Sequence, residues 1–174
     1  AEERQAEYER QYKKYESVAQ PRITSAKYFI DLEPYERNLY TRTELVLKNK
    51  TSQPIDSLHL TYNSYGIKLV EVMLPNAQVV LDDSELGYRI YQLGKPLLPG
   101  DSLAMTVRSA YESRGFENEV SLEQVVNNGS FFNQTLFVPA LGYENSRELT
   151  GRQERKDHDL PKRDRMPSID DQRA

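Results

Sequence analysis

The chain has 174 residues, with 23 Lys and Arg against 27 Asp and Glu, a formal net charge of −4, and no Cys or Trp. This length suits one domain with appendages, and the mildly acidic balance disfavours nucleic-acid binding, which usually depends on a basic patch. The lack of Cys excludes disulfides, thiolate zinc sites and cysteine nucleophiles, and no apolar run reaches the roughly 20 residues of a transmembrane helix.

Residues 1–20 are predicted to form a charged helix. They contain no Gly or Pro, and Tyr8, Tyr12 and Tyr15 are spaced by four and three, which places the rings on one helical face. Pro21 ends the helix. Two interpretations stay open: a solvated helix that leads into the next domain, or a connector from a preceding domain whose Tyr stripe docks on a neighbour. Because the chain starts with Ala rather than Met, we expect a processed chain or a segment of a longer one.

Residues 21–143 are predicted to form a β-domain. Apolar and polar residues alternate with period two in short runs, separated by turn signals such as Pro99-Gly100-Asp101. The seven expected strands are 26–33, 39–48, 57–62, 67–74, 78–81, 88–93 and 102–111. A last extended segment is expected over 131–138. No amphipathic helix interrupts the strands, so the fold class is all-β, an antiparallel β-sandwich or saddle of about seven or more strands.

Residues 144–174 are predicted to form a polar, partly helical tail. The stretch Arg147–Asp159 can form a short helix, interrupted at Gly151, and the remainder has almost no apolar content. Such a segment buries too little surface to order itself, so we expect it to need a partner surface or to stay mobile. We expect the tail to lead toward a downstream domain that is absent from this sequence.

The two histidines, His59 and His158, limit metal chemistry, because a zinc site needs several nitrogen or carboxylate ligands at close spacing. His59 alternates with leucines on a predicted strand, so it is expected to face solvent or a neighbouring sheet. His158 lies between Asp157 and Asp159, and we interpret this trio as a solvated charge cluster.

Paired carboxylates are the other chemistry to weigh, since they support glycosidase-type acid–base catalysis. The clustered candidates are Glu112, Glu117, Glu119, Glu123 and the pair Asp82-Asp83. With 27 acidic residues in the chain, such neighbours are expected by chance, and a catalytic carboxyl also needs a sheltered site. The sequence holds no G-x-S-x-G, P-loop or dinucleotide fingerprint, the motifs of acyl transfer and nucleotide chemistry.

Three N-x-S/T sequons begin at Asn49, Asn128 and Asn133. Each lies in a predicted loop or at a strand edge, so glycosylation is sterically possible in a eukaryotic secretory route. Sequons are short and frequent, and Asn-Gly also serves plain turns, so the motif carries little weight.

Four segments, in this order, resemble the amino-terminal β-domain of zinc aminopeptidases related to aminopeptidase N, the gluzincin group. They are Ala26–Pro34, Leu45–Thr51, Pro54–Leu60 with its Leu58-His59 pair, and Leu98–Val107. The chain also resembles bacterial membrane proteins in which an ABC-type permease is joined to such an aminopeptidase-like region. The segments that carry this second likeness are Gln20–Thr24, Asn128–Asn133, Leu141–Tyr143, Arg147–Leu149, Leu160-Pro161 and Arg165–Pro167.

The resemblance implies a non-catalytic module. The family's H-E-x-x-H zinc helix and G-x-M-E-N substrate strand are absent, so no catalytic, cofactor-binding or metal-binding residue is assigned here, and zinc is expected in the downstream catalytic domain. That domain is the expected partner, with a membrane permease part as a second one and no nucleic acid. Peptide substrate is expected only for the full-length protein, whose location would be the periplasmic face of a bacterial inner membrane. The loop Asn128–Gln134 corresponds to one that reaches the cleft in relatives, but no residue of it is assigned.

Two other function classes stay open. The first is a free-standing extracellular module that recognises protein or carbohydrate, which 12 Tyr favour because Tyr suits recognition surfaces. The second is a small carboxylate enzyme that uses the Glu112–Glu123 region.

Overall fold

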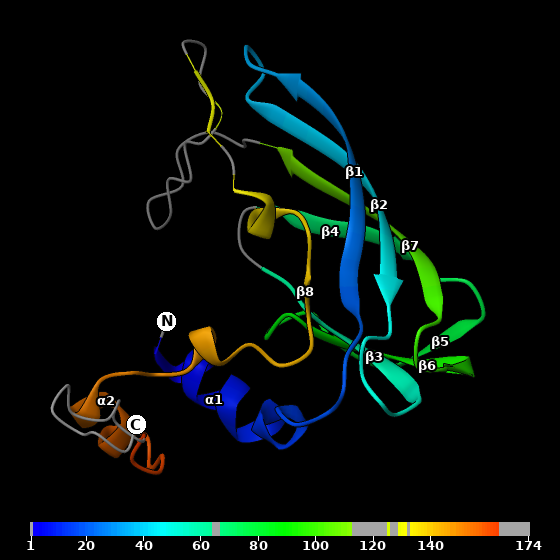
Figure 1. Cartoon of the computed structure of the whole chain (residues 1–174). Coiled ribbons are helices and arrows are strands. Elements are labelled where there is room, and N and C mark those ends of the chain that lie inside the picture. The colour runs from blue at the N-terminus through cyan, green and yellow to red at the C-terminus, as the bar shows by residue number, and fades with distance from the viewer. Residues whose placement is uncertain (1, 64–66, 113–124, 126–128, 132, 164–174) are drawn as a thin grey trace, which may run out of the picture.

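The fold consists of two antiparallel β-sheets with one helix at the N-terminus (Figure 1). The computed structural model describes residues 2–63, 67–112, 125, 129–131 and 133–163. The strands are β1 (Arg22–Glu33), β2 (Asn38–Lys48), β3 (Ile55–Thr61), β4 (Lys68–Met73), β5 (Ala77–Asp83), β6 (Tyr88–Leu97), β7 (Ser102–Glu112) and β8 (Ala140–Leu141). The helices are α1 (Glu2–Tyr12) and α2 (Arg152–Asp157), with 3-10 turns η1 (Lys13–Tyr15), η2 (Gln134–Leu136) and η3 (Asn145–Arg147). The predicted all-β class is confirmed.

The strand order is β1-β2-β7-β4 in the first sheet, called sheet A, and β5-β6-β3-β8 in the second, sheet B. Each of the seven predicted strands is present, although β1 begins earlier than predicted. The extended segment expected over 131–138 is wrong in part: η2 lies within it, because the Asn133 side chain accepts a hydrogen bond from the backbone N–H of Thr135 and so starts a helical turn. The short strand β8, which pairs with β3, was not predicted.

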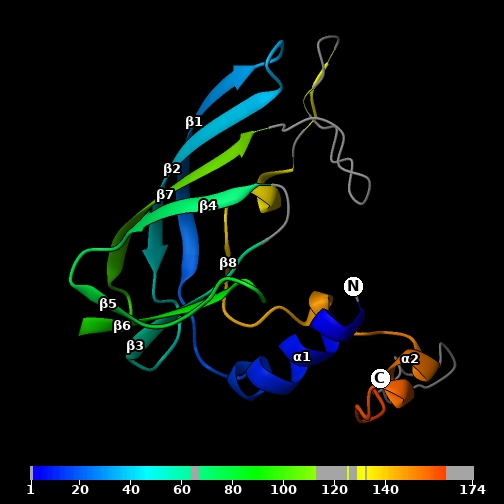
Figure 2. The same cartoon turned by 180° about the vertical axis from the view of Figure 1, so that it is seen from behind.

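The main core lies where the two sheets face each other. Alternate residues of β2 and β7 contribute Leu45, Leu47, Met105 and Val107, and sheet B contributes Leu58, Leu60, Tyr91 and Leu93. The period-two alternation places all of these side chains on the inner faces. Sheet A extends beyond sheet B at the end that carries the β1–β2 turn (Figures 1 and 2).

Helix α1 lies against the outer face of sheet B (Figure 1). The solvated interpretation of residues 1–20 is wrong for one face, because Tyr8 and Tyr12 are buried against Tyr88 and Ile90. The Tyr stripe therefore docks on this chain's own sheet.

The tail is also packed as far as the structure describes it. Leu149 and Arg155 are buried. The helix expected over Arg147–Asp159 is shorter than predicted: Gly151 lies at its N-cap and α2 covers Arg152–Asp157. The tail was expected to need a partner surface or to stay mobile, and α1 supplies such a surface for Arg155 and His158. Residues 164–174 lie outside the described part. Within the described part of the chain, no helix is long and apolar enough to cross a membrane.

Candidate functional site

Aromatic and charged side chains from α1, sheet B and the tail meet in one place, which we call the helix–tail junction. Its members are Tyr8, Glu9, Tyr12, Lys13, Tyr15, His59, Tyr88, Tyr143, Glu148 and Arg155. The junction holds four of the nine buried polar or charged side chains among the described residues, Glu9, His59, Glu148 and Arg155.

Stacked tyrosines form the apolar half of the junction. Tyr8 stacks on Tyr143 with ring centroids 5.0 Å apart, and Tyr12 stacks on Tyr88 at 4.2 Å. The Tyr8 hydroxyl lies 3.2 Å from Thr61 Oγ1 and accepts a hydrogen bond from the backbone N–H of residue 144 at 2.9 Å. A Tyr spacing of four in α1 therefore places one ring over the tail and the next over sheet B.

His59 lies beneath this layer, and the expectation that it faces solvent or a neighbouring sheet is wrong. Its alternation with leucines does place it on the face opposite the core, but α1 and η1 cover that face, with Tyr15 edge-on at 4.9 Å. Its Nδ1 lies 2.9 Å from the Tyr88 hydroxyl and its Nε2 lies 3.1 Å from Ser57 Oγ. Burial lowers the pKa of His59 to about 4, so the ring is neutral near pH 7.

Buried ion pairs form the polar half of the junction. Arg155 makes a two-pronged contact with Glu9, with Nη2 to Oε1 at 2.7 Å and Nη1 to Oε2 at 2.8 Å, and both side chains are at most 3% exposed. Burial by itself would raise the pKa of Glu9, but the hydrogen bonds and charges of Arg155 and Lys13 outweigh it and lower the pKa. Lys13 also donates to Glu148 at 2.9 Å, which accepts a second bond from the Tyr143 hydroxyl.

His158, from the tail, contacts α1, so the trio Asp157-His158-Asp159 is not purely solvated. Its Nδ1 lies 3.2 Å from a carboxylate oxygen of Glu3, and its backbone carbonyl accepts a bond from Arg10 at 2.7 Å. The two histidines lie in different layers of the junction, one against sheet B and one beside the first turn of α1.

The predicted carboxylate candidates are not brought together as a pair facing a cleft, as far as the structure describes them. Asp82 pairs with Arg89 at 2.8 Å, and Asp83 accepts a bond from Tyr12 and two more from backbone N–H groups in the turn that follows β5. Glu112 accepts a bond from the Tyr40 hydroxyl at 3.1 Å. The other three candidates, Glu117, Glu119 and Glu123, lie outside the described residues.

The sequon at Asn49 is not open to glycosylation in the folded chain, contrary to the sequence-based expectation. Asn49 is 1% exposed, and its Nδ2 donates to the carbonyls of Gln53 and Leu97, both at 2.8 Å. Asn133 is exposed, and its side-chain oxygen caps η2 by accepting a hydrogen bond from the backbone N–H of Thr135. Asn128 lies outside the described residues.

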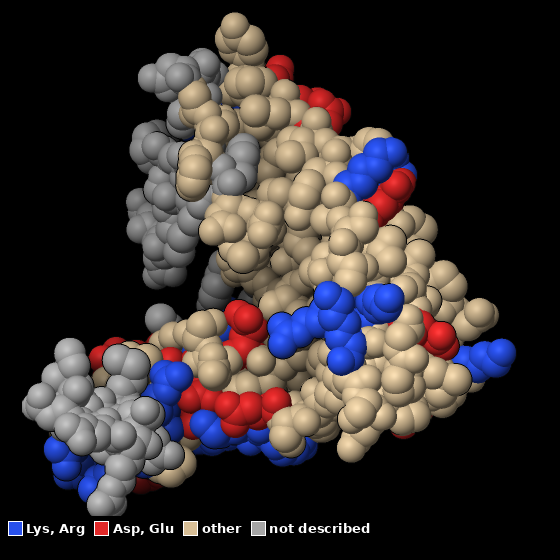
Figure 3. Space-filling model, viewed as in Figure 1, with Lys and Arg blue, Asp and Glu red and all other residues tan. Residues whose placement is uncertain are grey.

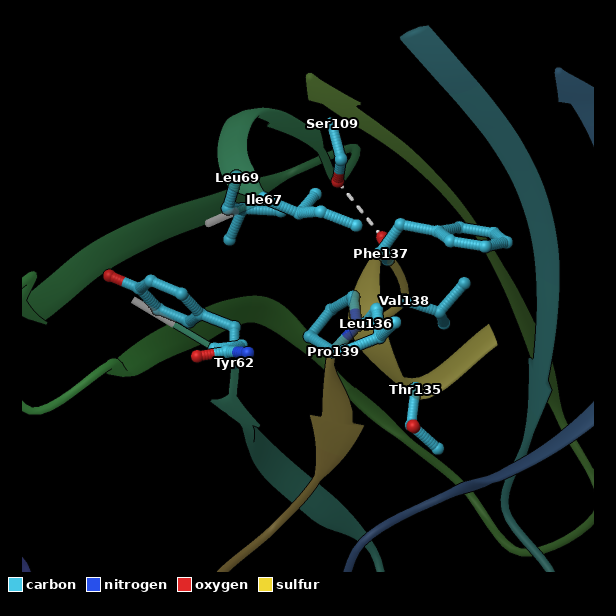
Figure 4. Close-up of a pocket in the computed structure, with 10 residues that line it drawn as sticks. Tyr62, Ile67, Leu69, Ser109, Thr135, Leu136, Phe137, Val138 and Pro139 are labelled. Atoms are coloured by element: carbon cyan, nitrogen blue, oxygen red, sulfur yellow. Dashed lines mark hydrogen bonds between the residues drawn. The ribbon is translucent and has the colours of Figure 1, made fainter. Parts of the chain in front are cut away.

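A small pocket lies between sheet A and the segment around η2 (Figure 4). Ile67, Leu69 and Pro139 line it, and Ser109 donates to the carbonyl of Phe137 at 2.9 Å across its wall. Its volume of about 10 Å³ is at the lower limit of about 10–15 Å³ that holds one water. The pocket is a gap between two packed elements and is too small to hold a substrate. Among the described residues, no three His, Asp or Glu are grouped so as to hold a metal ion.

The junction can hold α1 and the tail in fixed positions, but it exposes no reactive group. Sequence reasoning found its Tyr stripe and missed the Glu9–Arg155 pair, because those two residues are 146 positions apart. The only local signal was the spacing of four between Glu9 and Lys13, which lie 3.5 Å apart.

No family model matches this chain, and no curated protein matches its sequence. Solved structures with a similar fold include an M1 zinc metallopeptidase from Deinococcus radiodurans, with 14% identity and a TM-score of 0.47 over 70% of this chain and 29% of that chain. A mutant of that protein bound to a Tyr-Ser-Ala substrate gives 12% identity and a TM-score of 0.43, again over 70% and 29%. A mutant two-domain M1 zinc metallopeptidase bound to L-arginine gives 14% and 0.41, over 60% of this chain and 23% of that one. This chain therefore spans less than a third of each of these proteins, and nothing about its activity or ligands follows from such a likeness.

Proposed function

We propose that this chain is the non-catalytic N-terminal β-domain of a larger, membrane-associated aminopeptidase-like protein of the zinc metallopeptidase family. In this proposal residues 1–20 are the connector, 21–143 the β-domain, and 144–174 the tail that leads to the catalytic domain. The β-domain flanks the active-site cleft and docks on the catalytic domain, which holds the zinc and acts on peptides. A permease part joined to the same protein would place all of this on the periplasmic face of a bacterial inner membrane.

One observation carries the proposal: the segments that resemble this family contact one another. Asn49, from the second segment, accepts a bond on its backbone carbonyl from Gly100 N–H at 2.8 Å and donates its own N–H to the carbonyl of Asp101 at 2.9 Å. Its side chain reaches Gln53, next to the third segment, and Leu97, next to the fourth. Asn49 therefore joins the second segment directly to the fourth and to a residue beside the third, and the first segment pairs with the second where Ala26 lies opposite Leu45.

Two of the six segments that carry the second likeness, Gln20–Thr24 and Leu141–Tyr143, meet in the same way. Gln20 accepts a bond from the backbone N–H of His59 at 2.8 Å and donates to the carbonyl of Ser57 at 3.1 Å. The N–H of Gly142 donates to the carbonyl of His59 at 2.8 Å. Gly142 also approaches Gln20 so closely that an added Cβ would lie 3.1 Å from Gln20 Cγ, which supports Gly at this position.

The alternative is a free-standing extracellular module that recognises protein or carbohydrate. Its support was the number of tyrosines, but Tyr8, Tyr12 and Tyr88 are buried in the junction. Tyr35 is 84% exposed, at the turn between β1 and β2. The docking of α1 thus accounts for three of the 12 tyrosines, and among the described ones Tyr35 and, at 40%, Tyr28 keep exposed rings that such a module could use.

An activity assay tests the non-catalytic role. The 174-residue chain is incubated with aminoacyl p-nitroanilides and added zinc, beside an aminopeptidase as positive control. We expect no turnover above the buffer rate, and robust zinc-dependent turnover by this chain would refute the proposal.

The gene and a binding experiment test the place of the chain in a larger protein. We expect the reading frame to continue beyond Ala174 into an H-E-x-x-H helix, and a stop codon there would instead favour the free-standing module. The downstream segment, produced separately, is expected to co-elute with this chain in size-exclusion chromatography. Failure of the two parts to associate would contradict the docking role.

A further inference from the structure

The outer edge of β1 is a long strand edge with no described partner. β1 spans 12 residues and pairs with β2 on one side, while no described strand pairs with its other side. Figures 1 and 2 both show β1 at the margin of sheet A. An open edge presents a row of backbone N–H and C=O groups, which is a template for pairing with another strand.

The inner face of β1 is apolar and partly exposed. Tyr28, Ile30 and Leu32 are 40%, 54% and 37% exposed. They lie opposite buried residues of β2, with Ile30 across from Thr41 and Leu32 across from Leu39, so they continue the face that forms the core. Tyr28 makes an edge contact with the Phe137 ring at 5.9 Å. Among the described residues, the apolar face therefore runs out to the edge of sheet A with its outermost side chains partly exposed.

The outer face of β1 carries charges in a self-complementary order. Lys27 and Asp31 lie two residues before and two residues after Phe29, and both are exposed. A two-fold axis through Phe29 would place Lys27 of each copy opposite Asp31 of the other. On the inner face the same operation places Tyr28 opposite Ile30. Every pair joins residues that share a face, as antiparallel pairing requires.

We propose that a second copy of this chain pairs antiparallel with β1 across a two-fold axis at Phe29. Two copies of sheet A then form one continuous sheet, and the contact is the isologous type common in homodimers. The neighbouring register, centred on Ile30, would place Lys27 opposite Glu33 and bring the Asp31 carboxylate against the Phe29 ring. Glu33 already accepts a bond from Asn38 at 2.9 Å, so the axis at Phe29 gives Asp31 a partner that the other register does not. Acidic and basic side chains both lie among uncharged ones in the view of Figure 3, so the register decides which charges meet. This interface is independent of the proposed peptidase relationship.

A charge swap tests the pairing. Lys27→Asp places an aspartate opposite Asp31 of the other copy, on both sides of the two-fold axis. We expect the dimer dissociation constant, measured by sedimentation, to rise by about tenfold or more. Asp31→Lys is expected to do the same. The double variant Lys27→Asp/Asp31→Lys restores opposite charges and should return to within about threefold of the natural chain. Lys95→Asp, an exposed change in sheet B, is the matched control and should leave the dimer unchanged.

Cross-linking tests the register, and the absence of natural Cys makes a single introduced thiol unambiguous. Under oxidised glutathione, Phe29→Cys should give a disulfide-linked dimer at least about tenfold faster than Val70→Cys, which is 63% exposed on the opposite edge strand β4. Faster cross-linking of Ile30→Cys would overturn the axis at Phe29. A chain that stays monomeric up to about millimolar concentration, with equal cross-linking at all three positions, would overturn the proposal as a whole.

Discussion

The neutral, buried state of His59 leads to a specific prediction about acid stability. The pKa of His59 is about 4 in the folded chain against 6.5 for the free side chain, because burial disfavours the charged ring. Between these two values the unfolded chain binds more protons, so the free energy of unfolding falls as the pH falls. Between pH 7 and pH 5 this one group is expected to remove about 2 kcal/mol of stability.

The variant His59→Gln tests this reasoning, because Gln keeps a donor and an acceptor but does not titrate. Urea unfolding at pH 7 and pH 5, followed by circular dichroism, gives the loss of stability for each chain. The natural chain should lose about 2 kcal/mol more than the variant over this interval. Thr61→Val is the matched control: it removes a buried hydroxyl from the same strand without removing a titrating group, so its pH dependence should equal that of the natural chain. Equal losses in His59→Gln and the natural chain would refute the assignment of a buried, neutral ring.

Three further predictions test the packing by urea unfolding. Arg155→Met leaves Lys13, at 3.5 Å, as the charged partner of the buried Glu9 carboxylate and should cost up to about 3–5 kcal/mol; the double variant with Glu9→Gln should recover part of this, and a cost near zero would contradict the buried pair. Gly87→Ala should cost about 3 kcal/mol, because its φ is +70° and the new Cβ would lie 2.2 Å from a carbonyl oxygen. Gly100→Ala, with φ +87° but open space around it, should cost only about 1 kcal/mol, and equal costs would contradict the steric argument. Asn49→Ala should cost about 1–3 kcal/mol because it removes the donor to the carbonyl of the buried Leu97, while the Gln53 carbonyl keeps its bond from Thr51; a neutral result would show that this residue does not join its segments.

The strands could be predicted because their signal is local. Side chains alternate between the two faces of a strand, so a half-buried strand such as β2 shows a buried residue at every second position. Turn residues mark the ends in the same way, as Pro99-Gly100-Asp101 does before β7. These features depend on neighbours within a few positions and can be read without knowing the fold.

Two of the failures, at His59 and Asn49, have a shared physical cause, since each concerns what covers a surface. The sequence shows that His59 points away from the leucines of β3, but not that α1 lies over it. In the sequence, the sequon at Asn49 has the features of an exposed turn. In the structure, the side-chain amide of Asn49 donates a hydrogen bond to the carbonyl of Leu97, 48 positions away, and is buried there.

The amino-acid order by itself determined the strand positions, the class of fold, the helical face of the tyrosines and the scarcity of metal ligands. Only the tertiary structure decided which faces are buried, that α1 and the tail clasp each other through Glu9 and Arg155, and that β1 is left at an open edge. Burial depends on segments far apart in the chain, so the same alternating pattern is compatible with a covered face and with a bare one until the elements are assembled.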